Sequence, residues 1–231
     1  MSFDRLILAI DTCGPSGSVA LGRLPGRDVE IIGQTELAGR TYSATLVAAV
    51  AELLHSAQVE LRELGGIIVV TGPGSFTGVR VGLSAVKGLA EGTEIPVVAL
   101  SRLEVLSRKS GVPSSALNAH RGEVFLRLER MGSKPSEILA GPRELRAIDP
   151  APVRVAVCDD EAAAILAAAW PGTQWVATPP PAAADAIRLG EARLIAGAVA
   201  DLALLDGHYL RRSDAEIFGN EVEAKPVAAR S

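Results

Sequence analysis

The sequence predicts an α/β fold of two similar lobes, and three observations support it. Short apolar runs that indicate buried strands alternate with stretches of helical periodicity in residues 1–104. A glycine-rich turn, residues 72–78, joins one such strand to a helix. A weaker copy of the first strand–turn–strand pattern returns around residue 118. Together these features predict a mixed sheet with packed helices that occurs twice in the chain.

The first lobe, residues 1–104, is expected to run β-β-β-α-β-α-β. Its first apolar run ends at Asp11, and a polar turn leads into the second strand of a hairpin. The expected strands are 6–10, 18–21, 29–37, 66–71 and 96–100, and the expected helices are 41–57 and one from the glycine turn to about Glu91. This order is that of a ribonuclease-H-like half.

The second lobe, residues 105–208, is expected to be a shorter, degenerate copy, and residues 209–231 form a C-terminal tail. Its strand–turn–strand unit, 116–126, has the outline of residues 9–21. A further strand is expected at 153–158 and helices at 161–170 and 184–205, with a proline break at 179–181. Two such halves in tandem predict the duplicated architecture of actin, sugar kinases and acetate kinase.

Composition limits the class of protein. The chain has 231 residues, 48% of them hydrophobic, which argues against disorder. Its net charge is −4 without a basic block, which argues against tight nucleic-acid binding by this chain alone. Residues 1–5 are not followed by the long apolar stretch of a signal peptide, so none is expected, and no apolar run reaches the roughly 18–20 residues of a membrane span. Cys13 and Cys158 fit free thiols, so a cytoplasmic protein without a membrane partner is expected.

The glycine turn allows two interpretations. Glycines at 72, 74 and 78 permit positive φ and close approach of backbone, and Ser75 or Thr77 can cap the following helix. A helix N-terminus after such a turn can also bind an anion. The stretch lacks the spacing of a P-loop or of G-x-G-x-x-G. A tight structural turn is therefore favoured over a phosphate cradle.

Both first-lobe helices carry a second stripe of small residues besides the face toward the core. Long charged residues are usual on an outward face, and small ones allow another helix to come close. An uncovered patch of this kind is typical of a partner site, although the second lobe or the tail could also cover it. The stripes are Ala44, Ala48, Ala51 and His55 on the first helix and Thr77, Val81, Ala85 and Gly88 on the second.

Residues 72–82 read Gly-Pro-Gly-Ser-Phe-Thr-Gly-Val-Arg-Val-Gly. This stretch resembles the signature of the TsaB (YeaZ) family. That family belongs to the actin-like ATPase superfamily and is related to the TsaD proteins. Matching stretches span the chain and are found at 7–12, 18–21, 87–90, 121–125 and 209–211. Two positions depart from the pattern. Asn118 stands where Asp is usual, and Tyr42-Ser43 where a His-Ser or His-Thr pair is common.

The resemblance implies a non-catalytic scaffold. Such proteins pair with the transferase TsaD and, with the small ATPase TsaE, help place threonylcarbamoyl on the adenosine beside the anticodon of tRNAs reading codons that begin with A. Members contact TsaD, or each other when TsaD is absent, through the two first-lobe helices, and tRNA only indirectly. The implied interface residues are Ala44, Ala48, Ala51, His55, Thr77, Arg80, Val81, Ser84, Ala85 and Gly88.

Independent chemistry has little support in the residues. His55, His120 and His208 lack the one-turn spacing of a metal site, and none lies in the setting of a peptidase triad, so neither a catalytic nor a metal residue is assigned. Cys13 follows Asp11, whose carboxylate would raise the thiol pKa.

A stand-alone actin-like ATPase or small-molecule kinase is the main alternative. Asp11 and its turn could face Mg²⁺ and phosphate, but the corresponding second loop, 118–122, has one glycine and no carboxylate. No cofactor of its own is expected; weak or shared ATP or ADP contact would involve Asp11, Thr12, Gly74, Ser75 and Thr77. Arg211 and Arg212 could touch tRNA phosphate, although a structural or partner role is favoured.

Overall fold

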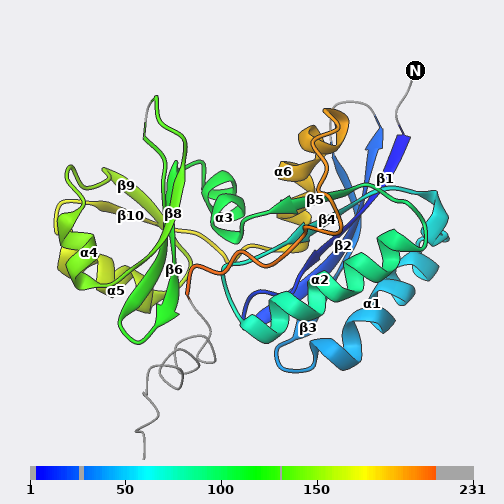
Figure 1. The fold of residues 1–231 in the computed structure, drawn as a ribbon, viewed down its shortest axis with the longest axis horizontal. Helices are drawn as coiled ribbons and strands as arrows, with labels where there is room; N and C mark the ends of the chain where they lie inside the picture. Colours follow the sequence, from blue (N-terminus) through cyan, green and yellow to red (C-terminus); the bar gives the residue numbers. More distant parts are fainter. Residues whose placement is uncertain (1–3, 26–28, 131, 212–231) are drawn as a thin grey trace, which may run out of the picture.

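The computed structural model describes residues 4–25, 29–130 and 132–211. These residues form two lobes, each with a five-stranded mixed sheet between helices (Figure 1). The strand order is β3-β2-β1-β4-β5 in the first sheet and, read in the same direction, β8-β7-β6-β9-β10 in the second. The two sheets therefore repeat one arrangement strand for strand, which confirms the predicted duplication. Within the described residues, no helix is long and apolar enough to cross a membrane.

The first lobe follows the predicted order closely. Its elements are β1 (Asp4–Asp11), β2 (Ser16–Pro25), β3 (Glu30–Ala38), α1 (Tyr42–Ser56), a 3-10 turn (Leu61–Glu63), β4 (Leu64–Val70), α2 (Phe76–Glu91) and β5 (Val97–Leu100). β1 pairs antiparallel with β2 and parallel with β4. β4 is almost continuously apolar because both faces of this central strand are covered.

The second lobe is a reduced copy. Its helices are shorter: α4 has 6 residues at the place where α1 has 15. The elements are α3 (Arg102–Ser110), β6 (Ser114–His120), β7 (Glu123–Leu128), β8 (Ser136–Ala140), α4 (Pro142–Ala147), β9 (Arg154–Val157), α5 (Asp160–Ala169), β10 (Gln174–Ala177) and α6 (Ala183–Ile195). α3, β8, α4 and β10 are not predicted from the sequence, because most of them are too short to show a clear period.

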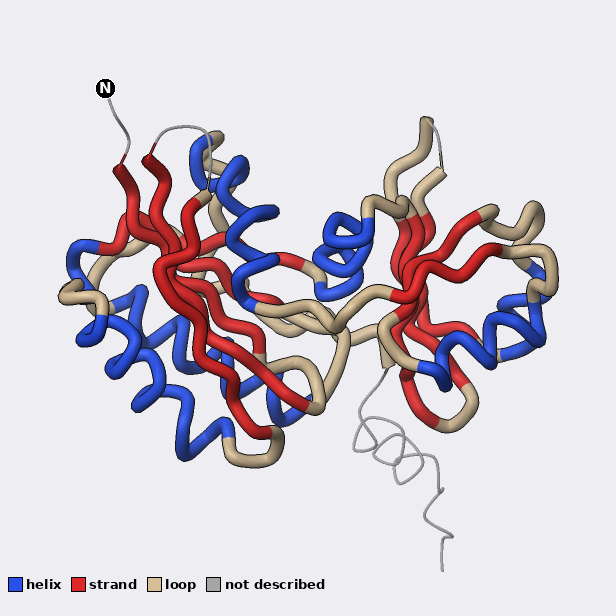
Figure 2. The backbone as a smooth tube through the Cα atoms, turned by 180° about the vertical axis from the view of Figure 1, so that it is seen from behind, coloured by secondary structure: helices blue, strands red, loops and turns tan. Residues whose placement is uncertain are grey.

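The last helix of each half packs on the sheet of the other half. α1 and α2 cover one face of the first sheet, and α6 covers its opposite face although it follows the second sheet in the chain (Figures 1 and 2). α3 follows β5 but packs on β6, β7 and β9. The prediction that residues 105–208 together form the second lobe is therefore wrong for α6, whose Ile187 and Leu194 belong to the first core.

The predicted helix 184–205 is too long. α6 ends at Ile195, since Gly197 adopts φ 68° and the Ala198 N–H donates to Arg193 O at 2.9 Å, the bonding pattern of a Schellman motif. Residues 200–211, which we call the strap, then return past both lobes (Figure 1). The strap is held where Ala200 N–H donates to Val97 O at 2.7 Å and His208 N–H to Thr71 O at 2.8 Å. Residues 212–231 of the predicted tail, which include Arg212, lie outside the described residues.

Candidate functional site

The glycine turn joins α2 to the turn between β1 and β2. A Cβ on Gly74 would overlap Cys13 O, and one on Gly78 would overlap Thr12 O. The same approach is secured by hydrogen bonds from Ser75 N–H to Cys13 O at 2.8 Å and from Thr12 Oγ1 to Gly78 O at 2.7 Å. These glycines are therefore needed for close packing of backbone on backbone. The contacts support the structural interpretation of the turn.

Ser75 is the residue that caps α2. Its extended backbone precedes the helix, and its Oγ accepts the Gly78 N–H at 3.2 Å. Thr77, the other predicted cap, lies within the first turn of the helix and is exposed. Of the two candidates, the structure selects Ser75.

A cleft of about 940 Å³ lies between the lobes. Three of the five predicted nucleotide-contact residues, Gly74, Ser75 and Thr77, belong to its lining. Asp11 and Thr12 are only 1% exposed at the end of β1. The second lobe contributes Asn118, His120 and Asp159 among others, and the strap contributes Arg211, which pairs with Glu123. The cleft is thus the place where an actin-like fold brings its two loops together.

Asp11 is already engaged below the cleft. Its Oδ1 accepts the Cys13 N–H at 2.8 Å, and its Oδ2 lies 3.3 Å from Nε of Arg102. Burial is the largest single effect and lowers the pKa of the Arg102 guanidinium, but the charges around it, that of Asp11 first, together outweigh burial and the pKa is raised. Arg102 is not predicted from the sequence as a partner of Asp11, from which it is 91 positions away.

The Cys13 thiol and the Tyr42 hydroxyl, which lie near Asp11, favour their neutral forms. Burial, followed by the Asp11 charge, raises the pKa of the Cys13 thiol well above its usual value, as the sequence predicted. The same two effects raise the pKa of Tyr42 to about 12. Tyr42, at the position where the family pattern has His, donates its hydroxyl to Gly14 O at 2.8 Å. Cys13 is therefore unsuited to act as a thiolate nucleophile.

In the loop of the second lobe, residues 118–122, the side chain of Asn118 is held by hydrogen bonds within the lobe. Asn118 Nδ2 donates to Glu161 Oε2 at 2.5 Å, and Asn118 Oδ1 accepts the His120 N–H at 2.7 Å. His120 and Arg121 both have positive φ in the tight turn between β6 and β7. In the described part of the chain, no three His, Cys, Asp or Glu side chains are grouped to hold a metal ion.

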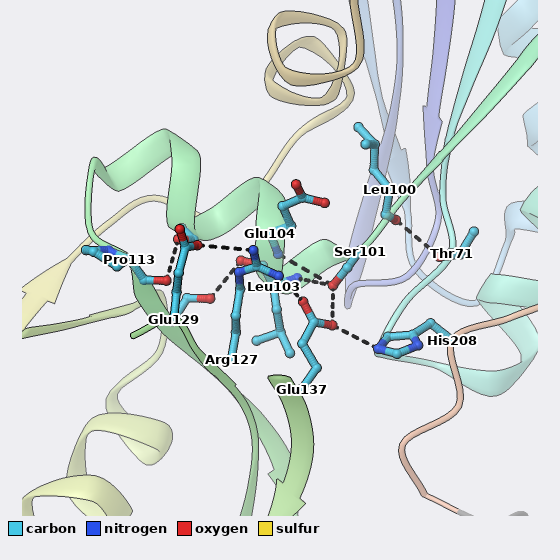
Figure 3. Close-up of polar contacts among 12 residues, drawn as sticks. Thr71, Leu100, Ser101, Leu103, Glu104, Pro113, Arg127, Glu129, Glu137 and His208 are labelled. Atoms are coloured by element: carbon cyan, nitrogen blue, oxygen red, sulfur yellow. Dashed lines mark hydrogen bonds and ion pairs between the residues drawn. The ribbon is translucent and has the colours of Figure 1, made fainter. Parts of the chain in front are cut away.

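Ser101, Glu137 and His208 meet beside the connection between the lobes, and Figure 3 shows the carboxylate between the other two. Glu137 Oε2 accepts the Ser101 hydroxyl at 2.6 Å and lies 2.8 Å from His208 Nε2. In a hydrolytic triad the histidine contacts the serine directly. Here Ser101 instead caps α3, with its Oγ accepting the Leu103 N–H at 3.2 Å. The cluster ties the first-lobe exit and the strap to β8, and it lacks the order of a peptidase site.

The exposed face of α1 and α2 carries the predicted stripes. Ala44, Ala48, Ala51 and His55 are exposed on α1, and Thr77, Arg80, Ser84 and Gly88 are exposed on α2, with Val81 and Ala85 half-buried. Val47, which the sequence analysis left out, is 66% exposed beside them. A groove of about 530 Å³ runs between the two helices and is lined by Tyr42, Ser43, Leu46, Val47, Thr77, Arg80, Val81, Ser84 and Ala85. We call this surface the α1–α2 face.

Comparison with known proteins agrees with this architecture. The family model of TsaD, tRNA N6-adenosine threonylcarbamoyltransferase, matches residues 32–126. The chain is 34% identical over 125 residues to a tRNA threonylcarbamoyladenosine biosynthesis protein TsaB of Escherichia coli K12, covering 52% of each sequence. It is 36% identical over 123 residues to the TsaB of Bacillus subtilis 168, again over 52% of each. The match thus spans about half the length of these curated relatives.

The solved structure of YeaZ from Pseudomonas aeruginosa extends the similarity to nearly the whole chain. It superposes with a TM-score of 0.69 at 25% identity and covers 89% of this chain and 100% of that one. The chain is thus similar to TsaB (YeaZ) proteins in sequence over about half of its length and in fold over nearly all of it. Glycines of the motif at residues 72–82 make the backbone contacts with Cys13 and Thr12 described above. The fold shared with YeaZ is the two-lobed actin-like one.

Proposed function

We propose that this chain is the non-catalytic scaffold of tRNA threonylcarbamoylation, acting as the partner of a TsaD-type transferase. Its sequence relatives are named for threonylcarbamoyladenosine biosynthesis. The observation that carries the proposal is the α1–α2 face, which is exposed, low in charge and made largely of small residues. Such a face permits two helices of a partner to pack at short distance and to bury Val47.

A related protein is a suitable occupant of this face. Residues 32–126, which match the TsaD family model, include both α1 and α2. A TsaD-type protein would therefore present equivalent helices, and two equivalent faces can pair about a pseudo-twofold axis. The same symmetry would allow two copies of this chain to pair when the transferase is absent.

The proposed complex assigns the remaining roles elsewhere. The transferase would hold the metal and carry out the transfer on the adenosine beside the anticodon, and a TsaE-type ATPase would join through the complex. tRNA would contact this chain indirectly, in the cytoplasm. We assign it no cofactor of its own; ATP or ADP would be bound weakly or at a shared surface.

Depletion of the protein tests this function. We expect threonylcarbamoyladenosine in bulk tRNA, measured by mass spectrometry of nucleosides, to fall strongly on depletion and to return with the wild-type chain. Ala48→Arg should not restore it, because a long charged side chain would stand in a close helix contact. An unchanged nucleoside level after depletion would contradict the proposed function.

Ala167→Arg provides the matched control. Ala167 is also an exposed helical alanine, but it lies on α5 in the second lobe, away from the α1–α2 face. We expect Ala167→Arg to restore the modified nucleoside as well as the wild type does. Equal complementation by Ala48→Arg and Ala167→Arg would show that the α1–α2 face has no such role.

A further inference from the structure

The actin-like fold implies a magnesium nucleotide in the cleft, with the carboxylate that ends the first strand beside the metal. In this chain that carboxylate is Asp11, and the residues around it do not fit the ion. We infer that the guanidinium of Arg102 stands in for the divalent cation, so that the cleft is closed to a magnesium nucleotide and the lobes are joined without one.

The ion pair is buried and specific. The side chains of Arg102 and Asp11 are 7% and 2% exposed, and Arg102 Nε lies 3.3 Å from Asp11 Oδ2. The other oxygen accepts the Cys13 N–H at 2.8 Å, so both carboxylate oxygens have partners. A second cation at Asp11 would meet a fixed positive charge within a few ångströms, which is strongly unfavourable in a buried setting.

The backbone is shaped to admit the arginine. A Cβ on Gly14 would overlap Nη2 of Arg102, so the guanidinium lies directly against this residue of the β1–β2 turn. In an actin-like enzyme this turn would face phosphate. Here the turn packs on one side against an arginine and on the other against α2.

In both loops, polar groups that face the cleft in an actin-like enzyme are bonded within this chain. The Ser75 N–H is bonded to Cys13 O at 2.8 Å, and the Thr12 hydroxyl to Gly78 O at 2.7 Å. In the second lobe, Asn118 replaces a carboxylate and is held by Glu161 and by the His120 backbone. Asp11, Thr12, Ser75 and Asn118 are therefore all engaged in bonds within the chain.

The pair also joins the two lobes. Asp11 ends β1 of the first sheet, whereas Arg102 begins α3, which packs on the second sheet. Actin-like enzymes bind a magnesium nucleotide between their lobes. In this chain the positive charge of Arg102 takes the place of the magnesium ion and is always present. It follows that the separation of the lobes in this chain does not depend on nucleotide.

The test uses Mn²⁺ as the probe and thermal unfolding as the readout, on the full chain. Arg102→Met frees Asp11, so its melting temperature should be low in EDTA and should rise with Mn²⁺, by about 3–5 °C at ten times the Mn²⁺ Kd. The wild type and Arg102→Lys, which keep a cation at this position, should show no Mn²⁺ response. Asp11→Asn/Arg102→Met should recover stability in EDTA and lose the response.

The design remains decisive if Arg102→Met is unfolded in EDTA, because Mn²⁺ should then restore its folded circular dichroism spectrum. An Arg102→Met chain that gains neither stability nor structure from Mn²⁺ would overturn the inference. So would calorimetry in which the wild-type chain binds Mg-ATP with micromolar Kd, since the ion pair would then coexist with the nucleotide.

Discussion

At the scale of single residues, Gly78 shows most directly what the glycine motif does. Its Cα faces Thr12 O so closely that no Cβ fits between them. Gly78→Ala must push α2 away from the β1–β2 turn, which should cost about 3 kcal/mol or more of unfolding free energy. Urea unfolding of the purified chain measures this loss.

Gly88, in the same helix, is the matched control. A Cβ at Gly88 would meet nothing within 4 Å. Gly88→Ala should therefore raise the unfolding free energy by about 0.5–1 kcal/mol, because alanine has the higher helix propensity. Similar effects of the two substitutions would show that helix propensity, and not contact with Thr12, explains the glycines.

Residue-level prediction from sequence succeeded where the signal was local. Ser75 lies directly before its helix, and Cys13 lies two positions from Asp11, so the cap and the direction of the thiol pKa could be inferred from neighbours. Arg102 could not be found in this way. Its contact with Asp11 depends on where α3 begins relative to the first sheet, which is information about tertiary structure.

At the scale of elements, α6 is the helix whose position the sequence did not reveal. Its apolar spacing predicts a helix with a buried face, but spacing does not say which sheet covers that face. The core contacts assign it to the first lobe, where Ile187 is fully buried and lies near Gly22 of β2. The short elements α3, β8, α4 and β10 were missed because too few residues repeat in each.

Ile187→Ala tests the placement of α6. Removal of a fully buried isoleucine from the first core should lower the unfolding free energy by about 2–5 kcal/mol. Ile195→Ala, on the same helix but at a 62% exposed position, should change it by less than about 0.5 kcal/mol. Equal effects in urea unfolding would contradict the packing of α6 on the first sheet.

At the scale of the whole molecule, the lobes are joined by charge as well as by the chain. Glu137 on β8 connects the strap to Ser101, which lies between β5 of the first sheet and α3. Burial works to raise the pKa of Glu137, but hydrogen bonds from His208, Ser101 and Arg127 outweigh it, so the pKa is lowered. A carboxylate with a lowered folded-state pKa stabilises the fold above its ordinary pKa and loses that contribution as pH falls.

Glu137→Gln should therefore be most destabilising near pH 7, by about 2–3 kcal/mol. The difference in unfolding free energy between Glu137→Gln and wild type should shrink as the pH falls below the ordinary pKa of glutamate. The wild-type carboxyl group is then protonated and, like the amide of glutamine, carries no charge. Urea unfolding at pH 7, 5 and 3 measures the trend. Glu129→Gln, at a more exposed partner of Arg127, should cost less than about 1 kcal/mol at any of these values. A pH-independent effect of Glu137→Gln would contradict this account.

Much of the whole-molecule architecture was visible in the sequence, because the hairpin at residues 9–21 and its echo at 116–126 mark the two sheets. The function of the surface is less predictable from the sequence. Helical spacing predicted that the small residues on α1 and α2 face outward, and they are exposed or half-buried in the structure. Which partner they contact depends on a second molecule.

The affinity of the purified chain for a TsaD-type transferase from the same organism is the measurement that tests the central claim most directly. We predict a one-to-one complex by calorimetry, weakened about 100-fold or more by Ala48→Arg, which corresponds to a loss of about 3 kcal/mol, and unchanged by Ala167→Arg. No complex with the wild-type chain, or equal affinity for wild type and Ala48→Arg, would contradict the claim.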